Sequence, residues 1–245
     1  MTTTFLDRWR LPLAARSDER ELLDAVVLDA HHLAVNLREL AMLNRLPGGV
    51  GASLAAITAL ADGRRDLSVL DAGTGGGDMA LAMARHGRTG AGASAWRVTA
   101  LDSSADVLAL AAARVGGDAE VRLERGNVLA LPFDDAAFDV AHASLLLHHL
   151  DPADAVTALI ELRRVARLGV VINDLRRGWL PYALTALAVR GLCRGRYTRH
   201  DGLASVRRAY TLRELDDLLA AAGLRVVARS AEFLPRIVTV AVAAT

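Results

Sequence analysis

The residues of this chain that are best suited to chemistry lie together between Val69 and Asp78. The stretch reads Val-Leu-Asp-Ala-Gly-Thr-Gly-Gly-Gly-Asp and is followed by the helix-forming run Met79–Ala84. This pattern predicts a buried strand that passes into a helix through a glycine loop. Glycine in such a loop permits positive φ and removes Cβ atoms, so we expect the backbone to lie against a ligand.

The spacing of the glycines indicates which ligand. A dinucleotide-binding loop has glycine at its first, third and sixth positions, whereas this loop has Gly73, Gly75 and Gly77, with Asp78 at the sixth position. Asp71 and Asp78 place two carboxylates beside the loop, which suits a cationic ligand better than a pyrophosphate. We therefore predict a loop that binds a cationic nucleoside, and a purely structural glycine turn is the alternative.

Polar residues also follow the next predicted strands. Residues 96–101 predict a second strand that ends at Asp102, where one carboxylate can accept both hydroxyls of a ribose. A third short strand over residues 121–124 leads to Asn127. Because ligands of open α/β sheets bind outside the carboxyl ends of the strands, we expect these residues to share one crevice.

Two further strands, over residues 138–143 and 168–172, extend the same alternation of strands and helices. Residues 144–150 (Ser-Leu-Leu-Leu-His-His-Leu) leave the first of them, and Asn173 and Asp174 end the second. Pro152 and Asp154 predict a helix N-terminus just beyond.

Taken together, residues 66–174 resemble class I S-adenosylmethionine-dependent methyltransferases, and more closely the small bacterial enzymes of the ubiquinone/menaquinone-biosynthesis type. The resemblance implies a Rossmann-like α/β fold, with a seven-stranded, mostly parallel sheet and helices on both faces. It implies S-adenosyl-L-methionine as cofactor and S-adenosyl-L-homocysteine as product. It places an adenine contact at Asn127, although an amide there departs from the commoner Asp and could instead satisfy its own turn. The implied cofactor-binding residues are Asp71, Gly73, Thr74, Gly75, Gly77, Asp78, Asp102, Ser103, Asn127, Val128, Ala143 and Ser144.

A narrower resemblance concerns the acceptor. Gly75–Asp78, Val171–Arg177, His200–Gly202 and Ser205–Thr211 are similar to a subgroup that is often encoded beside polyketide synthases. It implies a place in secondary metabolism and a small lipophilic or aromatic, polyketide-like acceptor, with transfer to a hydroxyl oxygen as the leading expectation. C-methylation of a quinol-like ring remains open, as does a non-methylating cyclisation or decarboxylation assisted by the cofactor.

Three histidines are candidate general bases for deprotonating such a hydroxyl. His149 is the first choice, because the end of the fourth strand faces the crevice in this fold, and His148 and His200 are the others. The alternative is that the two adjacent histidines only orient the following helix. His142 lies within a strand and is expected in the core. No third ligand accompanies His148 and His149 in the sequence, so no metal site is predicted.

Length and composition agree with these expectations. The chain has 245 residues, 53% of them apolar, and a formal net charge of +1, which does not favour nucleic acid. It has no lysine, so Schiff-base chemistry is excluded. Cys193 is the only cysteine, consistent with a cytoplasmic location. No window is apolar enough to span a membrane. The expected partner is a small-molecule acceptor, and a homodimer is left open.

The chain divides into two predicted parts. Residues 1–62 are expected to form an N-terminal helical cap, and residues 63–245 the Rossmann-like domain. An insertion over residues 176–210 is expected to form a lid, with a short apolar helix over 183–189 that either meets the acceptor or packs into the core. Thr211 and Glu214 predict a capping box, after which two strands, over 224–229 and 237–242, complete the sheet, the last one antiparallel.

Overall fold

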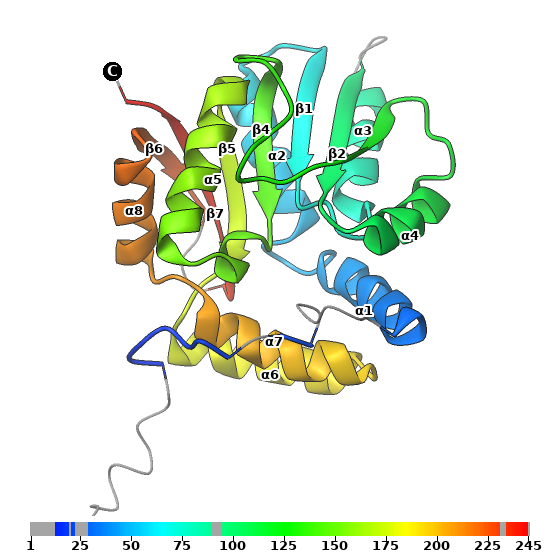
Figure 1. Cartoon of the computed structure of the whole chain (residues 1–245), viewed down its shortest axis with the longest axis vertical. Coiled ribbons are helices and arrows are strands. Elements are labelled where there is room, and N and C mark those ends of the chain that lie inside the picture. Colours follow the sequence, from blue (N-terminus) through cyan, green and yellow to red (C-terminus); the bar gives the residue numbers. More distant parts are fainter. Residues whose placement is uncertain (1–12, 20, 23–28, 90–94, 231–233, 245) are drawn as a thin grey trace, which may run out of the picture.

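A computed structural model describes residues 13–19, 21–22, 29–89, 95–230 and 234–244 (Figure 1). Its centre is a seven-stranded sheet of order β3-β2-β1-β4-β5-β7-β6. Six of the strands run in the same direction, and β7, which lies between β5 and β6, runs in the opposite direction. The strands are β1 (Leu67–Ala72), β2 (Trp96–Asp102), β3 (Val121–Arg125), β4 (Phe138–Ser144), β5 (Ala166–Leu175), β6 (Leu224–Arg229) and β7 (Arg236–Ala243). The predicted mostly parallel, seven-stranded sheet is confirmed.

Helices cover both faces of this sheet. The helices α2 (Val50–Ala61) and α3 (Asp78–Thr89) pack with one face, and α5 (Pro152–Val165) and α8 (Leu212–Ala221) pack with the other. The helix α4 (Ala105–Val115) contacts β2, β3 and α3. Because both faces are covered, a central strand such as β1 is apolar on both sides, as parallel strands require.

Local signals in the sequence explain where several helices begin and end. The Ser104 hydroxyl accepts a hydrogen bond from the Val107 N–H, and α4 stops at Gly116 with a φ of 63°. Pro152 occupies the first turn of α5. The predicted capping box of Thr211 and Glu214 is present at the start of α8.

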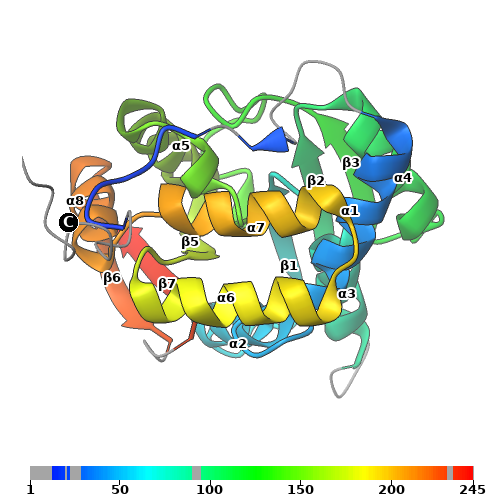
Figure 2. The same cartoon turned by 90° about the horizontal axis from the view of Figure 1, so that it is seen from below.

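The remaining helices lie below the carboxyl ends of the parallel strands. The short 3-10 turn η3 (Leu147–His149) follows β4, and α1 (Ala30–Leu43) lies beside the glycine loop. The helices α6 (Trp179–Leu192) and α7 (Arg196–Arg208) run side by side across this end of the molecule (Figure 2). They form a layer of their own beyond the edge of the sheet (Figure 1).

Two sequence predictions need adjustment here. The predicted helical cap over residues 1–62 is described only in part, because residues 1–12, 20 and 23–28 lie outside the described residues. Its described helices are α1, which begins at Ala30 and is capped by Asp29, and α2. The predicted lid helix over 183–189 is longer, and α7, which the sequence analysis did not predict, accompanies it. Within the described residues, no helix has the length and apolar character needed to cross a bilayer.

Candidate active site

A cavity of about 390 Å³ lies at the carboxyl ends of β1, β2 and β4, and α1 contributes to its lining. It is lined by most of the residues implied as cofactor contacts. Ten of those twelve line it, namely Asp71, Gly73, Thr74, Gly75, Asp78, Asp102, Ser103, Asn127, Val128 and Ser144. The topology thus brings together polar residues that follow different strands, as expected for this class of sheet.

The glycine loop has the backbone conformation that its composition predicts. Gly73, Gly75 and Gly77 have φ values of 69°, 55° and 73°, which side chains with a Cβ rarely adopt. A Cβ at Gly73 would lie 2.9 Å from a methyl carbon of Leu146. Gly77 instead faces Ala111 and Val115 of α4 and does not line the cavity. Its role in this structure is close packing between the loop and α4.

Asp102 is fixed by the glycine loop and by its own turn. One carboxylate oxygen accepts the Gly75 N–H at 3.0 Å, and the other accepts the Ser104 N–H at 3.0 Å. Each oxygen retains a lone pair for a further donor. Burial raises the pKa of Asp102 above its ordinary value. The side chain lines the cavity in a fixed orientation, as a group that accepts two hydroxyls should.

Asp71 is almost completely buried and its two oxygens have partners inside the protein. One oxygen is 2.8 Å from Nδ1 of His142, and the other accepts the Thr74 hydroxyl at 2.7 Å. The second ring nitrogen of His142 lies 3.0 Å from the Ser53 hydroxyl. His142 is therefore a hydrogen-bonded core residue, as predicted. Asp71 contributes negative charge from the base of the loop and also holds the fold together there.

Asp78 and Asn44 connect the loop to Arg236, the first residue of β7. The Asn44 amide donates to Asp78 at 2.8 Å, and its oxygen accepts from Arg236. Burial raises the pKa of Asp78. Arg236 also donates to Ser144 at 2.7 Å and to Asn173 at 3.0 Å. Asn173 was predicted to be one of the polar strand ends suited to a ligand. In the structure it is fully buried, bonds to Arg236 and lines neither cavity.

Asn127 adopts the simpler of its two predicted roles. Its side-chain oxygen accepts the Leu129 N–H at 2.9 Å, closing a turn. The residue still lines the cavity together with Val128. The second lone pair of this oxygen therefore remains for a donor on a ligand.

A smaller cavity of about 160 Å³ adjoins the first. Leu40, Leu145 and His149 line both cavities. Apolar side chains from α1, α6 and the ends of β4 and β5 make up much of the lining, and the polar groups include Glu21, Asn36, His148 and Arg236. Burial lowers the pKa of Arg236 to about 10. A mostly apolar chamber with a few polar groups suits a small, lipophilic molecule.

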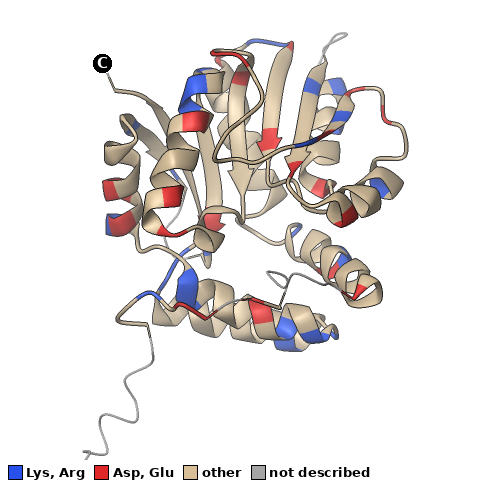
Figure 3. Cartoon of the chain, viewed as in Figure 1, with Lys and Arg blue, Asp and Glu red and all other residues tan. Residues whose placement is uncertain are grey.

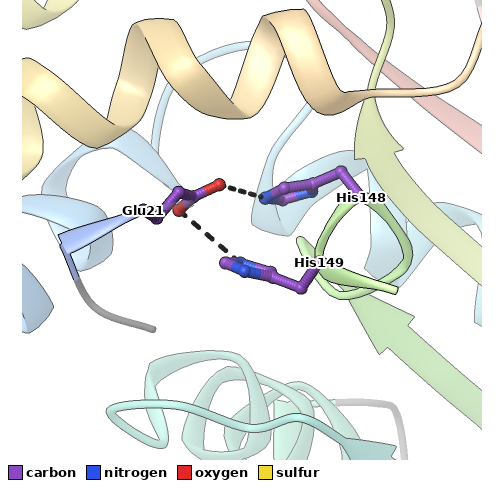
Figure 4. A group of neighbouring side chains, drawn as sticks. All are labelled: Glu21, His148 and His149. Carbon is purple, nitrogen blue, oxygen red and sulfur yellow. Dashed lines mark ion pairs between the residues drawn. The ribbon is translucent and has the colours of Figure 1, made fainter. Parts of the chain in front are cut away.

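The two cavities meet at a cluster of Glu21, His148 and His149 (Figure 4). The Glu21 carboxylate lies 3.6 Å from Nε2 of His148 and 3.8 Å from Nε2 of His149. The Ser205 hydroxyl donates to Glu21 at 2.8 Å. Glu21 lies more than 120 positions from the histidines in the chain, and no spacing in the sequence indicates that it would meet them.

His148 is held from both sides. Its Nδ1 lies 2.6 Å from Asp174, whose second oxygen accepts the His148 backbone N–H at 3.2 Å. Burial opposes ionisation of Asp174, but the charge and hydrogen bond of His148 outweigh it and hold the pKa of this carboxyl below its usual value. The ring of His148 is almost fully buried, whereas that of His149 is 27% exposed and lines both cavities. Both histidines line the smaller cavity, but only His149 also lines the larger one and has a partly exposed ring.

The backbone of η3 is fixed by two arginines from distant segments. Arg208 of α7 donates to the carbonyl of His149 at 2.8 Å, and Arg16 donates to the carbonyls of His148 and Leu150 at 2.9 and 2.7 Å. These bonds satisfy carbonyl groups that the short turn leaves unpaired. The position of His149 therefore depends on the N-terminal segment and on α7.

Two other predicted site residues lie away from the cavities. His200 is exposed on α7, next to Asp201 at 2.9 Å and Glu19 at 3.5 Å, and lines neither cavity. Its place on the outer side of α7 does not support a role as base. Ala143 is buried in the core beneath the cavity, because its side chain points into the sheet packing.

The argument against a metal site also changes. The sequence offered only His148 and His149, but Glu21 brings a third potential ligand atom, and all three lie within 4.8 Å of one another. The lack of a third ligand is therefore no longer an argument against a metal site at these residues. The described geometry suits acid–base chemistry equally, because each histidine faces a carboxylate.

The larger cavity fits an adenosyl sulfonium better than a dinucleotide. Its lining includes the carboxylates of Asp71, Asp78 and Asp102, while none of its described lining residues is an arginine and the chain has no lysine. A pyrophosphate would meet negative charge there, whereas a sulfonium and an amino group would be stabilised by it. The fold and this site together have the features expected of a Rossmann-like domain that binds a cationic nucleoside.

Comparisons with known proteins agree. Residues 69–169 match the family profile described as "Methyltransferase domain". The demethylmenaquinone methyltransferase of Bacillus subtilis is 33% identical over 103 residues, which are 41% of this chain and 41% of that protein. An uncharacterized 37.1 kDa protein of a Streptomyces fradiae transposon is 34% identical over 108 residues, 44% of this chain and 29% of that protein. The chain spans less than half the length of these curated relatives.

Solved structures show the same fold. Human N-acetylserotonin methyltransferase in complex with SAM has a TM-score of 0.65 at 15% identity, over 89% of this chain and 57% of that one. Magnesium protoporphyrin IX methyltransferase from Synechocystis with bound SAH has a TM-score of 0.58 at 18% identity, over 99% and 95%. Residues 69–169 are thus similar to a methyltransferase domain, including that of a menaquinone-type enzyme, and the fold is the one seen in S-adenosylmethionine-dependent methyltransferases.

Proposed function

We propose that this protein transfers a methyl group from S-adenosylmethionine to a hydroxyl oxygen of a small, lipophilic or aromatic acceptor. The observation that carries the proposal is the pair of adjoining cavities, one lined by carboxylates at the strand ends and one mostly apolar, with His149 lining both. When bound in the larger cavity, the cofactor supplies an activated sulfonium methyl. The rest of the work falls to residues of the chain.

The cofactor-binding residues would act by orientation and charge. Asp102 accepts ribose hydroxyls, Asn127 and Val128 border the base, and Asp71 and Asp78 favour the positive charge. Apolar side chains of α1, together with Leu145, Leu146 and Leu150 on either side of η3, line the same space and exclude water. Holding two reactants in register can contribute up to ~7 to 11 kcal/mol of barrier lowering.

His149 is the proposed general base. Its imidazole ring, 27% exposed, can accept the proton of an acceptor hydroxyl as the oxygen attacks, and the adjacent carboxylate of Glu21 stabilises the imidazolium that forms. His148, buried and fixed by Asp174, then positions Glu21 and His149. A phenol, with a pKa of about 10, gains the most from such a base.

The acceptor class follows from the smaller cavity. Its apolar lining suits an aromatic or polyketide-like molecule, as the sequence resemblance also implies. Methylation of a quinol carbon is the second candidate, because the B. subtilis relative is a demethylmenaquinone methyltransferase.

The test is an assay of the purified protein with S-adenosylmethionine and a panel of phenols, quinols and carboxylic acids. S-adenosylhomocysteine formation and the mass of the product report whether a methyl group moves and to which atom. We expect O-methylated phenols. Product without added methyl, or cofactor consumption without product, would contradict the proposal. Calorimetry against S-adenosylhomocysteine and against a nicotinamide dinucleotide checks the cofactor independently, and we expect heat only with the first.

A further inference from the structure

The outer face of α6 is unusually apolar for a surface that the described residues leave uncovered. Its side chains Trp179, Leu180 and Leu187 are 67%, 38% and 73% exposed, and Leu192 at the C-terminal end of the helix is 50% exposed. Half of the large exposed apolar side chains among the described residues are on this one helix. At 3.6 residues per turn, Trp179, Leu180, Ala183 and Leu187 share one side of the helix and form a continuous stripe. A shallow surface hollow runs along this stripe.

The same segment is strongly basic. Residues 176–208 contain eight arginines and one acidic residue, a formal charge of +7, although the whole chain has +1, so the remainder carries −6. The one acidic residue, Asp201, is buried. Exposed arginines follow the apolar stripe at the end of α6 and the start of α7, namely Arg190, Arg194, Arg196 and Arg199 (Figure 3). Within the described part of the chain, the first three form no ion pair.

The inner face of α6 has a different neighbour. Thr185, Ala188 and Val189 line the smaller cavity. One helix therefore separates the proposed acceptor cavity from the exposed apolar stripe. The helix also lies in the layer beyond the sheet, where Figure 2 shows α6 and α7 side by side across that end of the molecule.

We propose that the outer face of α6, with the arginines that follow it, docks on the surface of an anionic lipid bilayer. A helix of 14 residues cannot span a bilayer, but one with Trp and Leu on one side and arginines beside them is suited to lie in its headgroup region. Tryptophan at such a position favours the membrane interface. The charge selects this occupant over a second copy of the chain, because a twofold contact through α6 would bring the exposed arginines Arg190 and Arg194 of two copies together.

Docking would place the acceptor cavity next to the bilayer. If the proposed methyl transfer is correct, an acceptor dissolved in the membrane could enter beside α6 without crossing bulk water. This consequence rests on the proposed function, whereas the docking itself does not.

The experiment measures binding of the full chain to sedimenting vesicles, with neither cofactor nor acceptor present. Vesicles made of phosphatidylcholine alone are compared with vesicles made of phosphatidylcholine and phosphatidylglycerol in equal amounts. We expect at least roughly tenfold stronger binding to the anionic vesicles, weakened by salt, and a blue shift of tryptophan fluorescence that Trp179→Phe removes.

Variants locate the surface. Leu187→Glu, and separately Arg190→Glu with Arg194→Glu, should reduce binding at least roughly tenfold. Ile160→Glu on α5 and Arg225→Glu on β6, at exposed positions elsewhere, should not. Circular dichroism confirms that each variant is folded.

Equal binding to both kinds of vesicle, or variants that bind like the parent, would overturn the proposal. So would a dimer in light scattering that Leu187→Glu dissociates while vesicles remain unbound, because the face would then belong to a second copy. Failure of docking would leave the methyl-transfer assay in detergent-free solution unaffected, so the two proposals can fail separately.

Discussion

The two cavities differ in how the chain builds them. The larger one is made mostly from residues 71–150, where each strand delivers one or two polar groups to a common edge. The smaller one draws on Glu21, α1, η3, α6, α7 and the start of β7, segments far apart in the chain. The first depends on topology and backbone conformation, the second on side chains from the helices around the sheet. Substitutions in the second can therefore change the acceptor without disturbing the cofactor.

The largest effect on catalysis is expected from a substitution of His149, which lines both cavities. His149→Gln should lower kcat roughly 10² to 10⁴-fold, because the proton acceptor is lost, with little change in cofactor Kd. Rates of S-adenosylhomocysteine release and calorimetry measure the two quantities. His31→Gln, at an exposed position on α1, is the matched control.

Treatment with a chelator distinguishes a general base at His149 from a metal ion bound by Glu21, His148 and His149. We expect kcat to be unchanged after dialysis against EDTA. A loss that zinc or magnesium restores would reassign Glu21, His148 and His149 as metal ligands.

Asp71→Ala tests whether the base of the larger cavity is also structural. From the sequence, this change should abolish cofactor binding and leave the fold intact. The structure predicts a loss of about 3 kcal/mol in the free energy of unfolding as well, because His142 and Thr74 lose a buried partner. Urea denaturation measures it. An unchanged midpoint with weakened cofactor binding would restore the simpler expectation.

Asp102→Ala should separate binding from stability more cleanly. Loss of a charged acceptor for two hydroxyls should weaken cofactor binding about 100-fold, or about 2.7 kcal/mol. The nearby exposed Asp106→Ala is the control, with affinity expected within twofold of the parent. Similar losses in both variants would mean that the effect is electrostatic and general.

The smallest effect is a pH dependence of cofactor affinity. Because burial raises the pKa of Asp102, its carboxylate takes up a proton at a higher pH than a free Asp and then accepts hydroxyls poorly. Affinity should be constant near neutral pH and fall several-fold as the pH drops toward the raised pKa. Asp102→Asn should bind weakly at every pH and show a flatter profile. Asp78→Asn tests how much of the remaining pH dependence of cofactor affinity comes from Asp78, the other cavity carboxyl whose pKa is raised by burial.

The sequence predicted the elements that form the cofactor cavity with little error. The helix that begins at Pro152 and the capping box at Thr211 are as expected, because proline and capping residues act locally. Gly77 and Ala143, which were also predicted as cofactor contacts, do not line the cavity. A motif gives spacing, but which side of the backbone faces the cavity depends on packing against α4 and the core.

The amino-acid sequence by itself determined the parallel sheet, the glycine loop and the set of strand ends that meet at one edge. It could do so because each βαβ unit delivers its carboxyl end to the same side. Only the tertiary structure brought Glu21 to His148 and His149, put Arg236 behind Ser144, and left the apolar stripe of α6 outside while its other side lines a cavity. Such contacts join segments without mutual spacing, and they follow from how helices pack once the sheet has formed.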